Sequence, residues 1–552
     1  MTSFDAALAA VRDPATSCAD LTRIAQQYAD MRYLVAVHPN ADAVLLNWLD
    51  GLGDAFVCQA IAARRLKQPE LAAPVSVPDV EVVAEVVVVA PAKVRRSDLW
   101  VLGVMLLAVC VLVAVIAVSQ RSATLPMPSI SLPDVTPTMD TQPVPTLIEP
   151  RLMATSSFGG TGTDVFNAVA APAIVGDVPM PVIVAAGFTN STDGDFPAHH
   201  KGRDGVVALM SGGSGITWAK TLGGDGDDEF YAVATDASDN IYVAGDTSST
   251  DGDFPISHGG NADAVVVKLD WTGNVLWAKT FGGSGVDSFR ALTWSDGMLI
   301  AAGFTTSPDG DFAATHGGQD AVLAEITTDG EIVWANTYGG SGDDSFASVA
   351  FDYGNIAAVG RSYSSDGDFP NSPGGANAIV MMVSDTGDML WAEAYGGDGD
   401  DEFTGVAVTS NDDLVAVGDS NSLYGDFSGV SVGQPAGIIV QMVVPDGAIN
   451  VMSPSGAGAS WLRAVSVAAN DTIAYAGNVV PDQQDMQRMA TMGTAMGDSA
   501  KSLVWYGDGD SNFAGMVQCQ GGIIAVVGQT SSTTAELSAS HGGVDAIIAM
   551  FG

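Results

Sequence analysis

Short acidic loops, in which aspartates alternate with glycine, are the part of this sequence best suited to chemistry. Ca²⁺ takes about six to eight oxygen ligands in adaptable geometry, and carboxylates around a flexible glycine can supply them. Neither of the loops that fit has the full EF-hand pattern, which also needs a carboxylate at its twelfth position. The candidate calcium ligands are Asp225, Asp227, Asp228, Asp398, Asp400 and Asp401.

A structural role competes with calcium binding at these loops. Aspartate side chains commonly accept hydrogen bonds from nearby backbone and fix tight turns, while glycine supplies the positive φ angle. A second acidic loop, Asp-Gly-Asp-Phe, begins at Asp193, Asp251, Asp309 and Asp366. Because both loops recur at equivalent positions, we favour the structural role and retain Ca²⁺ only as a possible cofactor.

The motifs of common catalytic sites are missing from the sequence. We find no Gly-x-Ser-x-Gly nucleophile in a strand–turn–helix context and no Gly-Lys-Ser/Thr phosphate loop. His258, His316 and His541 share one position before Gly-Gly, which indicates loop architecture. Paired carboxylates could hydrolyse a glycosidic bond, but the many acidic residues single out no pair. We therefore expect a protein that is not an enzyme, and we name no catalytic residue.

The elements that position these loops are repeats. One stretch, Val275-Leu276-Trp277-Ala278-Lys279-Thr280-Phe281-Gly282-Gly283, recurs with Trp218, Trp334 and Trp391 in place of Trp277. Weaker copies carry Met153, Met452 and Trp505, which makes seven units. Each unit then continues with a run that starts with an aromatic residue (Trp461 in the sixth unit), a run that ends in glycine, and an apolar run often opened by Asp.

Four short strands repeated in tandem are typical of β-propeller blades. We therefore predict a mainly β fold in which residues 151–552 form a seven-bladed propeller. The domain begins on a Trp-type strand and ends on the Asp-Ala-Ile-Ile strand that starts at Asp545. We favour an arrangement in which the first strand completes the last blade, over seven blades that are each contiguous in sequence.

The units resemble bacterial β-propeller repeats marked by a Trp strand, Gly-Gly, Asp-Asp, a Val-Ala-Gly strand and an Asp-Phe-Pro loop. This resemblance implies the fold but no single activity. The tryptophans could also stack on sugars, but their place within apolar strands favours packing between blades. Trp271 and Trp294 fall outside the repeat and are weaker surface candidates.

The N-terminal residues 1–65 have a helical pattern, with a capping Asp13-Pro14 and apolar Leu21, Ile24 and Ala25 at helical spacing. This stretch resembles the variant leucine-rich repeat domain found at the N-terminus of many actinobacterial proteins. The resemblance implies a small all-α interaction module. The alternative is a helical bundle with no specific role.

Residues 99–119 contain no charge over 21 positions, enough for a helix to cross a ~30 Å hydrocarbon core. Residues 66–98 form a linker rich in Pro, Val and Glu, and residues 120–150 form a stalk rich in Pro, Ser and Thr. Basic residues gather before residue 99, and only Arg121 follows the span closely. The positive-inside rule thus predicts a single-pass cell-membrane protein with a cytoplasmic N-terminal module and an extracellular propeller.

Charge restricts the partners of this protein. The net charge is -43, from 64 acidic and 21 basic residues. Of these, 15 acidic and 10 basic residues precede residue 151, which leaves 49 acidic and 11 basic in the repeats. Such a surface repels nucleic acid. We expect a cell-surface protein that binds a protein or glycan ligand in adhesion, scaffolding or sensing, with a possible cytoplasmic partner for residues 1–65. The alternative is an extracellular propeller enzyme that acts on envelope polysaccharide or peptide.

Overall fold

The computed structural model describes most of residues 150–552 and a few helical positions near the N-terminus. Within the repeats it leaves out residues 173–180, 197–199, 212–214, 255–256, 296, 313–315, 353, 370–373, 431–433, 444–447, 453–457, 469, 482–488, 497–498, 506–507 and 534–540. Before residue 150 it describes only Ser17, Leu21, Arg23, Ile24, Leu45, Leu46 and Leu49.

The N-terminal positions agree with the predicted helices as far as they go. Leu21 and Ile24 are helical and buried, and so are Leu45, Leu46 and Leu49. The predicted linker 66–98, membrane span 99–119 and stalk 120–149 lie outside the described residues. Within the described part of the chain, no helix has the length and apolar character needed to cross a membrane.

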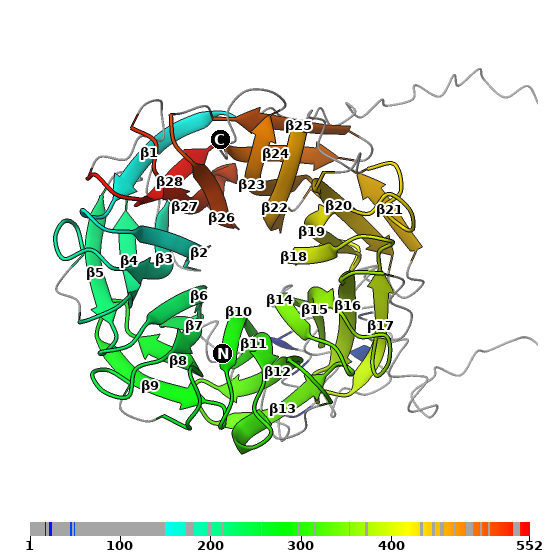
Figure 1. The fold of residues 1–552 in the computed structure, drawn as a ribbon, viewed down its shortest axis with the longest axis horizontal. Coiled ribbons are helices and arrows are strands. Elements are labelled where there is room, and N and C mark those ends of the chain that lie inside the picture. Colours follow the sequence, from blue (N-terminus) through cyan, green and yellow to red (C-terminus); the bar gives the residue numbers. More distant parts are fainter. Residues whose placement is uncertain are drawn as a thin grey trace, which may run out of the picture. The chain divides into compact units, whose positions relative to one another are not determined.

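The described strands of the repeats form seven antiparallel four-stranded sheets, arranged as blades around a central opening (Figure 1). This confirms the predicted seven-bladed propeller. The first three blades are blade 1, with β2 (Asp164–Ala170), β3 (Val182–Thr189), β4 (Asp204–Ser211) and β5 (Ile216–Leu222); blade 2, with β6 (Asp228–Thr235), β7 (Ile241–Thr247), β8 (Asp263–Leu269) and β9 (Val275–Phe281); and blade 3, with β10 (Asp287–Ser295), β11 (Met298–Thr305), β12 (Asp320–Thr327) and β13 (Ile332–Tyr338).

The other four blades follow the same order. They are blade 4, with β14 (Asp344–Asp352), β15 (Asn355–Ser362), β16 (Asn377–Ser384) and β17 (Met389–Tyr395); blade 5, with β18 (Asp401–Val408), β19 (Leu414–Ser420), β20 (Ala436–Val443) and β21 (Ala448–Met452); blade 6, with β22 (Gly458–Val467), β23 (Ile473–Pro481), β24 (Met489–Met496) and β25 (Ser499–Val504); and blade 7, with β26 (Ser511–Gln518), β27 (Ile524–Thr530), β28 (Asp545–Phe551) and β1 (Leu152–Phe158). Short 3₁₀ turns occur at Gly310–Phe312 and Gln520–Gly522.

Blade 7 closes the ring with strands from both ends of the propeller. β1 pairs with β28, and Phe158 lies opposite Ala546. The main chains of Arg151 and Gly552 exchange hydrogen bonds of 3.2 and 3.1 Å. The first strand therefore completes the last blade, as favoured from the sequence, and the backbone of β28 has a partner on each side.

Buried aromatic side chains fill the space between blades. The inner strands carry one fully buried phenylalanine in most blades, as the repeat predicted. In blade 3, Phe289 lies 5.8 Å from Phe281, the last residue of the preceding outer strand, with tilted rings. Blade 6 differs from the prediction, because Leu462 and not Trp461 takes the place of the phenylalanine. Leu462 pairs with Gly477 as Phe289 pairs with Gly303, and Trp461 lies one position earlier.

Three of the repeat tryptophans connect neighbouring blades. The indole N–H groups of Trp218, Trp277 and Trp334 donate to main-chain oxygens in the next blade, at Trp271, Thr328 and Asp385, each over 3.1 Å. Gly273, with φ of +85°, lies over Trp218, and a Cβ added there would come within 3.0 Å of the indole ring. These contacts confirm packing between blades. Trp271 and Trp294 are also half-buried against the core rather than free on the surface.

The weaker copies of the Trp strand were aligned wrongly from the sequence. Trp277 pairs with Lys268, and the residues in that register are Ala154, Asn450 and Lys501, not Met153, Met452 and Trp505. Trp505 instead stacks on Phe513, 5.6 Å between ring centres, as Phe281 does on Phe289. The sequence alone does not reveal this difference, because the register depends on the pairing of each strand within its sheet.

Candidate functional site

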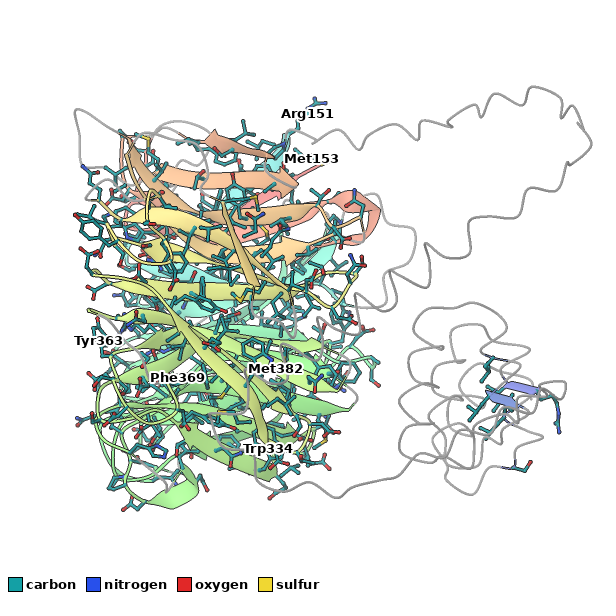
Figure 2. All side chains as sticks on the ribbon, turned by 90° about the vertical axis from the view of Figure 1, so that its right-hand side faces the viewer. Arg151, Met153, Trp334, Tyr363, Phe369 and Met382 are labelled. Atoms are coloured by element: carbon teal, nitrogen blue, oxygen red, sulfur yellow. The ribbon has the colours of Figure 1, made fainter. Side chains whose placement is uncertain are left out.

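The acidic loops all lie on one face of the ring, which we call the loop face. One loop joins each outer strand to the next inner strand, and the other joins the second and third strands of a blade. Seen edge-on, Tyr363 of the second type of loop lies at one face, whereas Trp334 and Met382 lie nearer the opposite face (Figure 2). We call that opposite side the turn face.

Two of the six candidate calcium ligands, Asp228 and Asp401, are buried at the start of inner strands. Asp228 accepts hydrogen bonds from the Ser249 hydroxyl over 2.7 Å and from the Gly224 N–H over 3.0 Å. Asp401 accepts the same pair from Ser422 and Gly397, at 2.7 and 3.1 Å. Burial raises the pKa of both carboxyl groups, and these hydrogen bonds oppose the rise.

The other four candidates have separate partners on the loop face. Asp227 accepts a hydrogen bond from the main-chain N–H of Arg203 over 3.0 Å, and Asp400 accepts one from the main-chain N–H of Ala376 over 2.9 Å. Each of these bonds connects two neighbouring blades. Asp225 pairs with Lys201 over 2.5 Å. Asp398 accepts from the N–H groups of Leu423 and Tyr424, at 2.8 and 3.0 Å.

The six aspartates are thus engaged by hydroxyl, N–H and ammonium donors of the protein. In the part of the chain that the structure describes, no three His, Cys, Asp or Glu side chains gather closely enough to hold a metal ion. Calcium binding at these residues stays a prediction. The observed hydrogen bonds show that the aspartates fix the loops and connect neighbouring blades.

The second acidic loop has the same role in blades 1 to 5. In blade 2, Asp253 accepts from the N–H of Gly223 over 3.0 Å and Asp251 from that of Asp225 over 2.8 Å. Equivalent bonds of 3.0 Å join Asp195 to Gly159, Asp311 to Gly282, Asp368 to Gly339 and Asp426 to Gly396. The histidines share this architecture, since the N–H groups of His258 and His316 donate to Asp263 and Asp320, at 2.9 and 2.8 Å.

The opening on the ring axis is lined by a set of residues that the sequence analysis did not single out. Each inner strand carries a β-bulge directly after its buried aromatic or leucine, and the bulged residue faces a cavity of about 220 Å³. Small side chains fill much of the remaining wall. The seven bulged residues are Asn167, Tyr231, Arg290, Ala347, Thr404, Arg463 and Ala514.

Arg290 belongs to a charged network that spans blades 1 to 3, the first arginine network (Arg203, Glu229, Asp246 and Arg290). Glu229 and Asp246 face each other across β6 and β7. Arg203 approaches Glu229 to 3.1 Å, and Arg290 approaches Asp246 to 3.5 Å. The guanidinium of Arg290 also lies 3.7 Å from the ring centre of Tyr231, a stacked cation–π contact.

A second arginine network (Arg361, Glu402, Asp419 and Arg463) repeats this plan in blades 4 to 6. Glu402 and Asp419 are cross-strand neighbours. Arg361 lies 3.8 Å from Glu402, and Arg463 lies 3.4 Å from Asp419. Arg290 and Arg463 therefore reach the cavity from blades 3 and 6, and each is held by an aspartate of the preceding blade.

Burial dominates the electrostatics of both networks. It raises the pKa values of Glu229 and Asp246, while the nearby arginines oppose the rise. It also raises the pKa of Asp419 to about 6, with a further contribution from Glu402 and an opposing one from Arg463. The repeat contained a signal for this site: the position after each inner-strand aromatic varies, although the positions around it are nearly constant.

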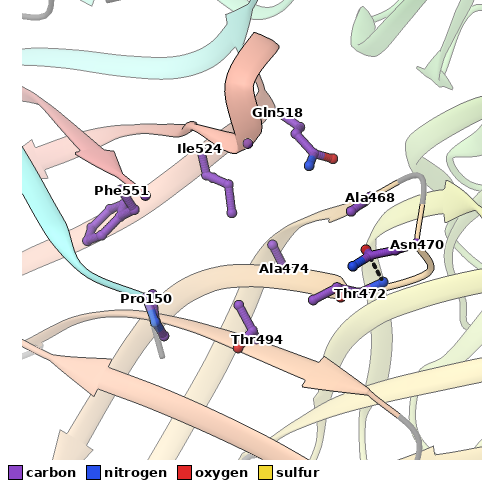
Figure 3. Close-up of a pocket in the computed structure, with 11 residues that line it drawn as sticks. Pro150, Ala468, Asn470, Thr472, Ala474, Thr494, Gln518, Ile524 and Phe551 are labelled. Carbon is purple, nitrogen blue, oxygen red and sulfur yellow. Dashed lines mark hydrogen bonds between the residues drawn. The ribbon is translucent and has the colours of Figure 1, made fainter. Parts of the chain in front are cut away.

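A second cavity, of about 360 Å³, opens between blades 6 and 7 (Figure 3). A regular interface, that of blades 2 and 3, is filled by large side chains. Tyr242, Lys268 and Trp277 lie side by side on the second, third and outer strands of blade 2, and the rings of Tyr242 and Trp277 lie 6.3 Å apart. Blade 6 has Ala474, Thr494 and Lys501 in these registers. Ala474 and Thr494 line the cavity, so the smaller side chains of the irregular blade leave space that the regular blades fill.

Among the comparisons with known proteins, one family model matches the N-terminal part of the chain. The family described as Leucine Rich Repeat Variant domain matches residues 5–65, which confirms the resemblance seen in the sequence. No curated protein matches the chain.

Many solved structures match the propeller, at low identity. The WD40 β-propeller domain of Doa1 is 12% identical and covers 73% of this chain and 97% of its own, with a TM-score of 0.41. The polysaccharide lyase Uly1 is 9% identical and covers 70% and 90%, with a TM-score of 0.38. The β-propeller domain of the Trilobed protease from Pyrococcus furiosus is 8% identical and covers 67% and 93%, with a TM-score of 0.36.

Proposed function

We propose that this protein is a cell-surface receptor that binds a ligand at the central cavity of its propeller and catalyses no reaction. The observation that carries the proposal is the wall of the cavity. It presents two guanidinium groups, Tyr231 and small side chains. The carboxylates closest to this wall are held by arginines, so they are poorly placed to exchange protons with a substrate.

The rest of the chain supports presentation of this ring outside the cell. Residues 99–119 form the membrane anchor, and the basic residues before it keep residues 1–98 in the cytoplasm. The stalk 120–150 separates the ring from the bilayer, and the leucine-rich repeat variant module binds a partner inside the cell. The ligand is a protein or a glycan of the envelope of an actinobacterium-like cell.

Capture of cell-envelope material by the full-length protein in detergent tests ligand binding. Ala347 is a small residue of the cavity wall, so Ala347→Trp should block the cavity and abolish capture. Thr272→Trp is the matched control, because Thr272 is exposed on the turn face and should leave capture unchanged. Equal capture by both variants would place the ligand elsewhere, and no capture by the wild-type protein would contradict the proposal.

Protease treatment of intact cells tests the topology. The ring should be released or cut, while a tag at the N-terminus stays protected. A protected ring would contradict the extracellular placement.

The second candidate function is an enzyme that acts on envelope polysaccharide or peptide. The cross-strand pair Glu402 and Asp419 favours it, because the pKa of Asp419 is raised to about 6 and carboxyl pairs of this kind serve in sugar hydrolysis. Glu402→Gln should then abolish release of reducing sugar from envelope polysaccharide, with Glu331→Gln, exposed on blade 3, as the control.

A further inference from the structure

Most arginines in the propeller sequence belong to the two arginine networks, and two of them line the central cavity. The sequence after residue 150 contains six arginines: Arg151, Arg203, Arg290, Arg361, Arg463 and Arg488. Four of these belong to the two arginine networks. The same part of the chain contains 49 acidic residues among a total of 64, so a negatively charged surface surrounds a channel whose wall holds guanidinium groups.

The two arginines of the wall retain the capacity to bind a ligand. Arg290 and Arg463 each approach their aspartate through one nitrogen, at 3.5 and 3.4 Å, rather than through a two-pronged pair. Their side chains are 33% and 37% exposed. A guanidinium presents several N–H groups in a planar fork, and an acid group can accept two of them at once.

We propose that the cavity binds a carboxylate group of its ligand through Arg290 and Arg463. This inference rests on the proposed function, since it names the chemistry of the ligand that the cavity takes. The ligand carries one such group on a neutral or basic body, because the acidic surface repels polyanions. An acidic sugar and the C-terminus of a peptide are two sources of the same group.

A carboxylate suits the cavity better than a phosphate does. Glu229, Asp246, Glu402 and Asp419 lie directly behind the arginines. A phosphate monoester carries close to two negative charges at neutral pH, so it would meet a stronger repulsion from these four residues than a singly charged carboxylate would. Tyr231 keeps the Arg290 guanidinium in place by stacking against it, which limits the loss of side-chain freedom on binding.

Isothermal titration of the full-length protein in detergent tests this inference with small probes. D-glucuronate and N-acetyl-alanyl-alanine carry the carboxylate, and their amides are the neutral counterparts. Binding of at least one acid, about tenfold or more tighter than its amide, is expected. The preferred acid identifies the source. Tighter binding of inorganic phosphate than of either carboxylate would overturn the inference.

Variants separate a specific site from general attraction. The double variant Arg290→Gln/Arg463→Gln should lower the affinity for the preferred acid by about tenfold or more. Arg203→Gln removes a charge of the first network that does not line the cavity, and it should change the affinity by less than about threefold. An equal loss with Arg203→Gln would overturn the inference, as would equal affinity for acid and amide. Melting temperatures verify that each variant is folded.

The outcomes also separate this inference from the proposed function. If no acid binds but the wild-type protein still captures envelope material and Ala347→Trp does not, the carboxylate inference is wrong and the cavity remains the binding site. If neither the acids nor envelope material bind, both fail.

Discussion

At the scale of single residues, the acidic side chains of this protein have different roles according to burial. Asp228 and Asp401 are enclosed and bonded to hydroxyl and N–H donors, so they fix the loop that enters each inner strand. Asp419 is only partly buried, lies against Glu402 and is held by Arg463. Identical residue types therefore serve as turn supports in one place and as anchors for cavity arginines in another.

Asp419 should make the stability of the ring depend on pH. Its folded pKa of about 6 exceeds the ~3.9 of an aspartate in an unfolded chain. Because the pKa of Asp419 is higher in the folded state, its protonated form stabilises that state. This contribution to the free energy of unfolding is complete below about pH 4 and is lost as the pH rises through 6. Between pH 5 and 7.5 the free energy of unfolding of the wild-type protein should therefore fall by about 1 kcal/mol more than that of Asp419→Asn.

Thermal unfolding followed by circular dichroism at both pH values measures this difference. Asp366→Asn is the control: hydrogen bonds from Ser341 lower the pKa of this exposed carboxyl, so it stays ionised across the whole window. The same pH dependence in Asp419→Asn and wild type would show that Asp419 does not titrate in this range.

At the scale of elements, outer strands connect each blade to the next. The Trp277 indole lies against the core formed by blades 2 and 3 and donates to Thr328. Trp218 of blade 1 and Trp334 of blade 3 repeat this contact, whereas blades 5 and 6 have Asn450 and Lys501 in the same register. The cavity between blades 6 and 7 shows what the interface loses when large side chains are replaced by Ala474 and Thr494.

Trp277→Ala should therefore destabilise the ring by about 2–4 kcal/mol, because it removes both the packed ring and an inter-blade hydrogen bond. Leu276→Ala is a control in the same strand, since the Leu276 side chain is 51% exposed and should cost about 0.5 kcal/mol or less. Chemical denaturation of both variants measures the difference. Similar losses would mean that the indole contributes little to the interface.

At the scale of the whole molecule, closure of the ring depends on one strand from the beginning of the propeller. β1 covers the edge of β28, so the last blade is complete only when both ends of the domain are present. The ring in turn creates the cavity, because its wall takes one bulged residue from each inner strand. A change at either end of the domain thus affects a site formed by all seven blades.

A chain that starts at residue 160 should fail to form a stable ring, because it exposes the edge of β28 and the apolar side chains that β1 covers. A chain that starts at residue 150 retains β1 and is the matched control. Size-exclusion chromatography and thermal melting compare the two. A shorter chain that stays monomeric and melts at the control temperature would show that closure is not needed.

The sequence by itself determined the strand count and the seven-fold repeat, and it favoured closure by the first strand, which the pairing of β1 with β28 confirms. These features follow from the spacing of apolar runs and glycines, which act locally. It also predicted the leucine-rich repeat variant module, which the family match at residues 5–65 confirms. Only the tertiary structure decided the register of the irregular blades, where Trp505 and Met452 had been misaligned, because register depends on which backbone lies alongside.

The cavity site likewise came from tertiary structure. Arg290 and Arg463 occupy the same position three repeats apart, and each is paired with an aspartate of the blade before it. No local pattern brings them together. They share a cavity because the bulge occupies the equivalent position in every inner strand. When the ring closes, these seven positions together line the cavity on its axis.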